Sequence, residues 1–283
     1  MRALSNYFLF LIIAITSTHA FARPVSDTPA GWTLSWSDEF NGSDGSAPDA
    51  TKWDFDLGGK GWGNHELECY TNRLENAQVR GGNLVVTASS EKAFHCSDGV
   101  VSNYTSARML TRNKFQQAYG RFEARIKIPS GQGMWPAFWM LGDNIGSVGW
   151  PASGEIDIME NIGREPAVLH GSIHGPGYIG EAGMSHIFTL PSGKLADDFH
   201  IYAIDWEPDV VRFYIDTTLY ATFTRKDLPA NGVWEFDHPF FILLNVAVGG
   251  DWPGPPDKTT VFPQTMLVDY VRVYKKQPAG SHD

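Results

Sequence analysis

The sequence is poor in basic residues and in long apolar runs, and each shortage excludes a class of protein. Lys and Arg number 22 against 32 for Asp and Glu, which gives a formal net charge of -10 at pH 7. A nucleic-acid binder needs a basic surface for phosphates, so we expect no nucleic acid as a partner. No apolar run approaches the ~20 residues of a membrane-spanning helix, so we expect no membrane partner either.

Cysteine is also scarce, since only Cys69 and Cys96 occur. Two lone cysteines make a poor metal site. In an exported protein they could form one disulfide, and two free buried thiols are the alternative. The sequence leaves this choice open.

Long amphipathic helices, repeats and low-complexity tracts are missing as well. The chain instead shows short β-rich runs separated by Gly, Pro, Asn and Asp. The clearest runs are 84–88, 119–128, 210–215, 240–248 and 267–274. Many short strands without helices predict an all-β fold, a β-sandwich of jelly-roll type with two stacked antiparallel sheets.

The N-terminal segment has the pattern of an export signal. Residues 1–22 contain Arg2, an apolar run from Tyr7 to Ile15 and small residues ending at Ala22. This predicts a signal peptide cleaved near Ala22 and a secreted protein, extracellular or periplasmic. We expect a linker over 23–30, a single catalytic domain over 31–276 and a tail over 277–283.

Three acids stand close together in the run from Gly154 to Asn161, which reads Gly-Glu-Ile-Asp-Ile-Met-Glu-Asn. In an extended strand, Glu155 and Asp157 share one face, and strict alternation sends Glu160 to the other. A β-bulge between Asp157 and Glu160, with Met159 as the extra residue, would return Glu160 to the acidic face. All three carboxyl groups would then face one cleft.

Such a group of acids suits glycoside hydrolysis, in which one carboxylate attacks the anomeric carbon and a second carboxyl protonates the leaving oxygen. A solvated acidic strand and a calcium cluster are the alternatives. An exposed strand would rarely carry isoleucine at both 156 and 158, and calcium loops prefer Asp, Asn and Gly at alternate positions. Catalysis is therefore the favoured interpretation.

The run from Gly154 to Asn161, with Trp150 and Pro151 ahead of it, resembles the active-site signature of family 16 glycoside hydrolases in its laminarinase-like form. Three other segments resemble family segments in the family's order, namely 133–142, 245–254 and 268–274. A further segment, 62–71, resembles one that reaches the cleft, although a tyrosine more often stands at the position of Cys69. The resemblance covers most of residues 32–274.

This resemblance implies roles for the three acids. Glu155 matches the nucleophile, Glu160 the acid/base and Asp157 the assisting aspartate of the family. It implies a retaining, two-step mechanism through a covalent glycosyl-enzyme, with no cofactor for catalysis. It also implies a jelly-roll sandwich in which the concave sheet forms the cleft.

Three tryptophans, Trp135, Trp139 and Trp150, match family residues that line the sugar subsites, and core packing is the alternative for each. Further candidate substrate-binding residues are Asn64, Arg108, Asn245 and His174. The first three match positions that hydrogen-bond sugar hydroxyls, although Asn245 could instead be a structural amide that satisfies backbone groups. We expect His174 to lie near the acid pair.

Many family members carry a structural calcium ion away from the chemistry. The matching positions are Glu39, Gly82 and Asp269. One carboxylate is a weak calcium signal, and a structural aspartate in a strand is the alternative.

The leading hypothesis is a secreted, monomeric, endo-acting hydrolase that cuts internal β-1,3 linkages of laminarin-like β-glucans, its polysaccharide partner. A mixed-linkage β-glucanase or a galactan hydrolase on the same scaffold is the second hypothesis. A non-catalytic, lectin-like glucan-binding protein is the third, and relatives of that type lack the catalytic glutamates that are present here.

Overall fold

Alternation of apolar and polar side chains gives this chain its strands, and β8 (Gly120–Lys127) illustrates it. Phe122, Ala124 and Ile126 of β8 are fully buried, whereas Arg121 and Arg125 on the opposite face are half-buried. A pleated strand presents alternate residues to opposite sides of a sheet, so one side of β8 packs on the core. The run predicted over 119–128 therefore forms a strand, β8, within those bounds.

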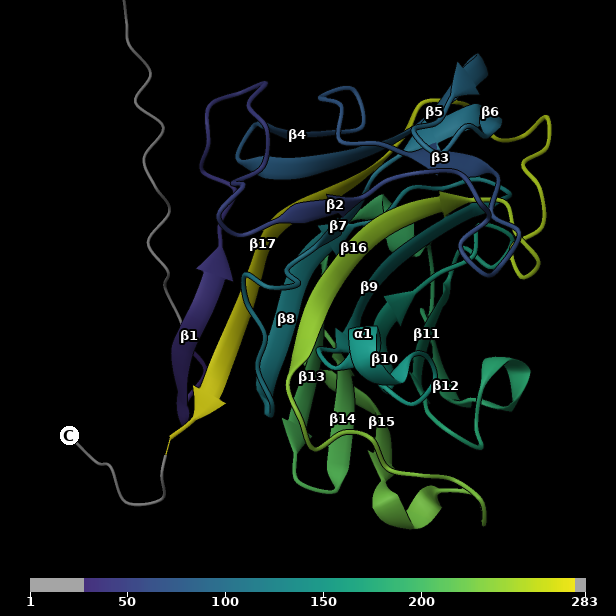
Figure 1. Cartoon of the computed structure of the whole chain (residues 1–283). Coiled ribbons are helices and arrows are strands. Elements are labelled where there is room, and N and C mark those ends of the chain that lie inside the picture. Colours follow the sequence, from purple (N-terminus) through teal and green to yellow (C-terminus); the bar gives the residue numbers. More distant parts are fainter. Residues whose placement is uncertain (1–27, 278–283) are drawn as a thin grey trace, which may run out of the picture.

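The computed structural model describes residues 28–277, which form two antiparallel sheets packed face to face (Figure 1). The first sheet comprises β1 (Trp32–Asp38), β3 (Glu68–Tyr70), β4 (Ala77–Arg80), β5 (Asn83–His95), β6 (Val101–Ser106), β8, β13 (His200–Glu207), β14 (Val210–Ile215), β15 (Thr218–Thr224) and β17 (Gln264–Lys276). Among its pairs in the described part, β3 with β6 is parallel.

The second sheet carries the site. In spatial order it comprises β12 (Met184–Thr189), β11 (Val168–His174), β10 (Glu155–Glu160), β9 (Met134–Gly142), β16 (Phe240–Val248), β7 (Arg108–Leu110) and β2 (Asp54–Asp56). Figure 1 shows β16 and β9 curving side by side across the molecule. The predicted all-β sandwich of two antiparallel sheets is confirmed.

Helical structure is confined to short connections. The described residues contain one α-helix, α1 (Ile145–Val148), and three 3-10 turns, η1 (Gly180–Ala182), η2 (Leu195–Asp197) and η3 (Arg225–Asp227). Within residues 28–277, no helix is long and apolar enough to cross a membrane.

The main core lies between the two sheets and takes side chains from both. From the second sheet, Ile156, Ile242 and Leu244 are fully buried in it, and from the first, Phe122 and Val271. Burial of each such side chain contributes about 1.5–3 kcal/mol. The opposite side of the second sheet is therefore left to carry the polar residues of the site.

Cys69 and Cys96 form a disulfide, which decides the choice that the sequence left open. Their Cα atoms are 5.7 Å apart, and 27 positions separate them in the chain. The bond ties β3 to the end of the β5–β6 hairpin.

Several of the predicted segments lie outside the described residues. These are the signal peptide over 1–22, most of the linker over 23–30 and all but the first residue of the tail over 277–283. Those assignments stay predictions, as does the single domain over 31–276.

Candidate active site

The three acids of β10 face the same side of the second sheet because the strand contains the predicted bulge. Against β9, Asp157 pairs with Trp139 and Met159 pairs with Phe138, which leaves Ile158 without a partner. The register with β11 also shifts between Asp157 and Glu160. The extra residue relative to β9 is therefore Ile158, and the prediction of Met159 was wrong.

The reason lies in the core beneath the bulge. Ile158 and Met159 are both fully buried, so alternation of polarity could not tell which of two consecutive apolar residues lacks a partner. Both stand opposite Gly171 of β11. A side chain at Gly171 would collide with Tyr220 and Phe213, which shows how closely the core fills the space behind the bulge.

A cleft of ≈ 390 Å³ lies over the acids on this face of the sheet. Its walls come from β7, β9, β10 and β16, from α1 and from the loop before β3. The predicted site residues that line it are Asn64, Arg108, Trp135, Trp139, Trp150, Glu155, Asp157, Glu160 and Asn245. Residues as far apart in the sequence as Asn64 and Asn245 therefore meet in one cleft.

Each glutamate of the site receives a hydrogen bond from a tryptophan. Trp150 Nε1 donates to Glu155 Oε2 at 2.7 Å, and Trp135 Nε1 donates to Glu160 Oε1 at 2.9 Å. An indole N–H can only donate, so these bonds favour the ionised carboxylates. The two indoles thereby fix the position of one oxygen on each glutamate.

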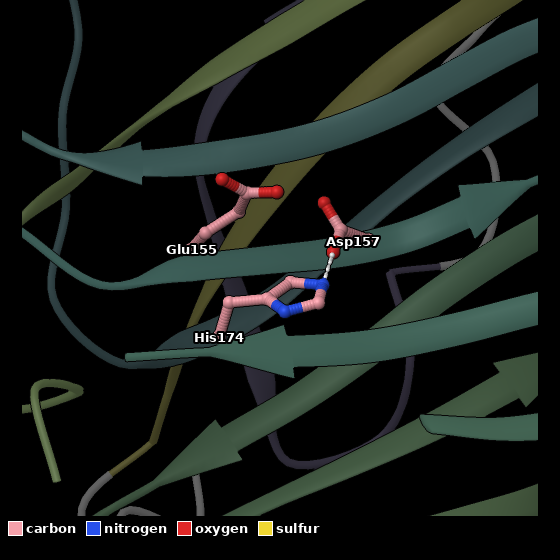
Figure 2. A group of neighbouring side chains, drawn as sticks. All are labelled: Glu155, Asp157 and His174. Carbon is pink, nitrogen blue, oxygen red and sulfur yellow. Dashed lines mark ion pairs between the residues drawn. The ribbon is translucent and has the colours of Figure 1, made fainter. Parts of the chain in front are cut away.

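Asp157 lies deeper than the glutamates and contacts a histidine. Figure 2 shows Glu155 and Asp157 rising from the same strand, with His174 reaching Asp157 from the neighbouring strand. His174 Nε2 is 3.1 Å from Asp157 Oδ2, and the Asp157 residue is 3% exposed. The prediction that His174 lies near the acids is confirmed, but it is not among the residues that line the cleft.

Burial changes the titration of all three acids. It raises the pKa of Glu155 to about 8, and the charge of Asp157 adds to the rise. It raises the pKa of Glu160 to about 7, against the opposing hydrogen bond from Trp135. Burial and the charge of Glu160 raise the pKa of Asp157 well above its usual range. The three acids therefore share protons near neutral pH, where isolated carboxyl groups would all be ionised.

The same group offers the ligand types of a transition-metal site. One donor atom each from Glu155, Asp157 and His174 lie within 4.8 Å of one another. The trio is built into the acid cluster itself, and Trp150 already occupies an oxygen of Glu155. A metal bound here would take the carboxyl groups that glycosidase chemistry needs.

Arg108 forms part of the cleft wall with two aromatic rings. Its guanidinium carbon lies 5.0 Å from the ring centroid of Trp62 and 4.7 Å from that of Trp139. Its Nε atom is 2.9 Å from Asp56 Oδ2. The stacked rings and the ion pair hold the guanidinium group against the wall.

Asn245 is 6% exposed, and protein groups bind both ends of its amide. Its Oδ1 atom accepts from Trp139 Nε1 at 2.7 Å, and its Nδ2 atom donates to Tyr70 Oη at 3.1 Å. Asn64 donates from Nδ2 to Glu66 Oε1 at 3.0 Å. Both asparagines line the cleft, and the partners of the Asn245 amide are side chains and not the backbone groups of the alternative interpretation. Sugar binding by Asn245 stays a prediction.

Seven residues that line the cleft were not predicted from the sequence, and two of them, Trp62 and Glu66, carry side-chain donor or acceptor atoms. Both lie in the segment that resembles a cleft segment of the family, so the resemblance was the available signal for Trp62. For Glu66, a further signal was the i, i+2, i+4 spacing of Glu66, Glu68 and Tyr70, which places polar groups on one side of an extended segment.

The one carboxylate of the predicted calcium set, that of Asp269, already accepts a hydrogen bond from Arg125 at 2.8 Å. Glu39, whose expected contribution is a backbone oxygen, binds Arg272 through its side chain at 2.9 and 2.8 Å. Gly82 lies in the turn between β4 and β5. Calcium prefers six to eight oxygen ligands, and the positive charge that a calcium ion would supply is provided here by guanidinium groups. Calcium at Glu39, Gly82 and Asp269 stays a prediction.

Comparisons with known proteins agree with this geometry. The family model described as Glycosyl hydrolases family 16 matches residues 65–272. The β-glucanase of Rhodothermus marinus is 43% identical over 274 residues, which cover 94% of this chain and 93% of that protein. A glucan endo-1,3-beta-glucosidase of Cryptopygus antarcticus is 39% identical over 258 residues, which cover 85% of this chain and 91% of that protein.

A solved structure, the laminarinase catalytic domain of Thermotoga maritima MSB8, has a TM-score of 0.81 at 48% identity and covers 87% of this chain and 99% of that one. The fold predicted from the sequence and the suspected family are both confirmed. This chain belongs to family 16 of the glycosyl hydrolases.

Proposed function

We propose that this protein is a secreted, endo-acting β-1,3-glucanase that hydrolyses laminarin-like glucans with retention of configuration. The observation that carries the proposal is the bulged β10 strand, which turns Glu155, Asp157 and Glu160 into one cleft lined by tryptophans. The substrate class is supported by relatives that match most of the chain, a β-glucanase and a glucan endo-1,3-beta-glucosidase.

The mechanism has two displacement steps at one carbon. A carboxylate oxygen of Glu155 attacks the anomeric carbon, and the bond from that carbon to the glycosidic oxygen breaks. Glu160 gives its proton to the departing oxygen. In the second step Glu160 takes a proton from water, the water oxygen attacks the same carbon, and Glu155 is released as a carboxylate.

The roles of the two glutamates follow from the family match and not from titration. In the free protein, the pKa of about 8 for Glu155 and about 7 for Glu160 place more proton on the proposed nucleophile. Asp157 is next to Glu155 and holds His174 on its other side. Its role in the proposal is to share a proton with Glu155, which leaves Glu155 ionised when the sugar is bound.

Export is a separate part of the proposal. It is supported by the signal-peptide pattern over residues 1–22 and by the disulfide between Cys69 and Cys96, a bond typical of oxidising compartments. A polysaccharide too large to enter a cell also requires a hydrolase outside the cytoplasm. A monomer with a β-glucan as its partner remains the expectation.

The test is reducing-sugar release from laminarin, curdlan, barley β-glucan, cellulose and agarose. We expect cleavage of laminarin with a rapid fall in chain length, the sign of endo action. Glu160→Gln removes the proton donor and should lower kcat on laminarin by about 10²–10⁴-fold. Glu123→Gln, which changes a buried carboxyl group on the other sheet, is the matched control and should retain activity.

Other outcomes would redirect the proposal. Cleavage of barley β-glucan or agarose with laminarin intact would replace the substrate and leave the mechanism standing. Glucan binding without reducing-sugar release, equal in the wild type and in Glu160→Gln, would favour the lectin-like alternative.

A further inference from the structure

We infer that Glu66 is a positioning residue for the part of the cleft wall formed by the loop before β3, β9 and β16, where it orients Asn64, Asn245 and Trp139 toward a bound glucan. The inference rests on the proposed function, because it concerns how the same cleft holds its substrate. Nothing in the match to the family assigns this role to Glu66. The role follows from where the hydrogen bonds of the wall converge.

Both oxygens of Glu66 accept hydrogen bonds from different groups. Asn64 Nδ2 donates to Oε1 at 3.0 Å, and Tyr70 Oη donates to Oε2 at 2.9 Å. Glu66 is 8% exposed and lines the cleft. A carboxylate with one donor on each oxygen holds both donors in fixed directions.

Tyr70 links Glu66 to further residues of the cleft wall through a second hydrogen bond. Because the Tyr70 hydroxyl donates its hydrogen bond to Glu66, its oxygen is left to accept from Asn245 Nδ2, which lies 3.1 Å away. The amide of Asn245 is thereby oriented, and its Oδ1 atom accepts from Trp139 Nε1 at 2.7 Å. Every donor along this chain points toward Glu66, so the negative charge sets the direction of the whole chain.

The end of the chain is a sugar-binding surface. With its N–H bound to Asn245, the Trp139 ring is fixed, and the guanidinium of Arg108 lies 4.7 Å from its centroid. Asn64, Asn245, Trp139 and Arg108 all line the cleft. Three of these four residues are thus connected to Glu66 through hydrogen bonds of 3.1 Å or less.

The residues that follow Glu66 are anchored to β16, and one of them is the buried acid Glu68. Glu68 is fully buried, and its Oε2 atom accepts from the backbone N–H of Val248 at 2.6 Å. Burial raises the pKa of Glu68 well above its usual range, and the charge of Glu66 adds to the rise. A second backbone bond, from Leu67 N to Val248 O at 2.8 Å, ties this segment to the end of β16. Because Asn245 lies on β16 together with Val248, these bonds also fix the distance between Glu66 and Asn245.

Glu66→Gln tests the inference with the smallest change in shape. Glutamine has one accepting oxygen, so either Asn64 or Tyr70 loses its acceptor and the direction of the chain is no longer fixed. We expect KM for laminarin to rise by roughly tenfold or more, with kcat changed much less, because the catalytic acids lie on β10. Glu123→Gln, a buried glutamate at 6% exposure, should leave KM unchanged.

A double-mutant cycle separates positioning from general destabilisation. If Glu66 acts through Asn245, the effect of Glu66→Gln on KM shrinks in an Asn245→Ala background. Full additivity of the two effects would overturn the inference, as would an unchanged KM in folded Glu66→Gln protein. If Glu66→Gln does not fold, Tyr70→Phe removes the same link and should raise KM in the same way.

The activity of the wild-type protein on the polysaccharide panel separates failure of this inference from failure of the proposed function. If the wild type cleaves a panel polysaccharide other than laminarin, the proposed substrate fails, and the ratio of KM values on the cleaved polysaccharide still tests Glu66. If it cleaves none, the Kd for laminarin, followed by tryptophan fluorescence, takes the place of KM. An equal Kd for the wild type and Glu66→Gln would then overturn the inference.

Discussion

The two catalytic glutamates differ in the exposure of the indoles that hold them. Trp150 is 47% exposed and stands on the loop before β10, whereas Trp135 is half-buried in β9. The bond from Trp150 to Glu155 is 2.7 Å long and lowers the pKa of that carboxyl group against the rise from burial. One exposed side chain therefore controls part of the ionisation of the proposed nucleophile.

Trp150→Phe removes this donor and keeps an aromatic ring. The pKa of Glu155 should rise further above about 8, by roughly half a unit or more. Because the nucleophile has to be ionised, the acidic limb of the kcat/KM profile, which reports the free enzyme, moves to higher pH. Activity at pH 6 should then fall more than activity at pH 9, which a pH–rate profile on laminarin measures.

Trp62→Phe is the matched control for that change. Trp62 also lines the cleft, but its indole donates to the backbone oxygen of Gly58 at 3.2 Å and not to a carboxylate. Its loss should leave the acidic limb in place. Equal shifts in the two variants would contradict the role given to Trp150.

At the scale of the element, β10 carries a cost in stability for the sake of its chemistry. Burial of the three acids disfavours their charged forms, and their mutual repulsion adds to this. The core side of the same strand is fully apolar, with Ile156 and Ile158 buried. The buried apolar side chains stabilise the strand in the sheet, whereas ionisation of all three acids on its other face would destabilise it.

Glu155→Gln should therefore stabilise the protein at alkaline pH. The folded pKa of Glu155, about 8, lies above its ordinary value of 4.5, so its protonated form stabilises the folded state below pH 4.5 and this contribution is lost as pH rises through 8. Glutamine stays neutral at every pH. Thermal unfolding should give equal Tm values at pH 4 and a higher Tm for Glu155→Gln at pH 9.

Glu91→Gln provides a control of opposite sign. Arg73 lowers the pKa of Glu91 through a hydrogen bond, so the ionised form stabilises the fold above the ordinary pKa, and that contribution is lost as pH falls. This variant should be less stable than the wild type at neutral pH. A Tm advantage of Glu155→Gln that did not grow with pH would contradict the account of β10.

At the scale of the molecule, one wall of the cleft is a loop that is held by backbone hydrogen bonds and, through the adjoining strand, by a disulfide. Residues 61–67 bring Trp62, Asn64 and Glu66 to the cleft, and β3 follows directly. The disulfide joins Cys69 of β3 to Cys96 beyond β5, in the first sheet. The disulfide therefore anchors the strand that follows this wall within the first sheet, whereas the second sheet forms the floor of the cleft.

Replacement of both cysteines by serine should lower the free energy of unfolding by about 3 kcal/mol, since the bond closes a 27-residue separation. Because the loop carries cleft residues, KM should also rise. Denaturant unfolding measures the first effect and laminarin kinetics the second. Reductant should destabilise the wild type to the same extent and leave the double serine variant unchanged, whereas an equal response of both proteins would contradict the prediction.

Local pattern was enough to predict several of the strands and the placement of the three acids on one face. The predicted runs 210–215 and 240–248 coincide with β14 and β16, because strand polarity and turn residues are local properties. The three acids on one face, the bulge and the family were likewise contained in a short motif and its flanking segments.

Tertiary structure alone decided which groups meet across the fold. The pairing of Cys69 with Cys96, the identity of the unpaired residue in the bulge, the contact of His174 with Asp157 and the convergence on Glu66 all depend on strand register. Register is set by packing between residues far apart in the chain, such as Tyr70 and Asn245. A sequence pattern determines which face a side chain takes, and only the packed sheets determine which side chain stands opposite it.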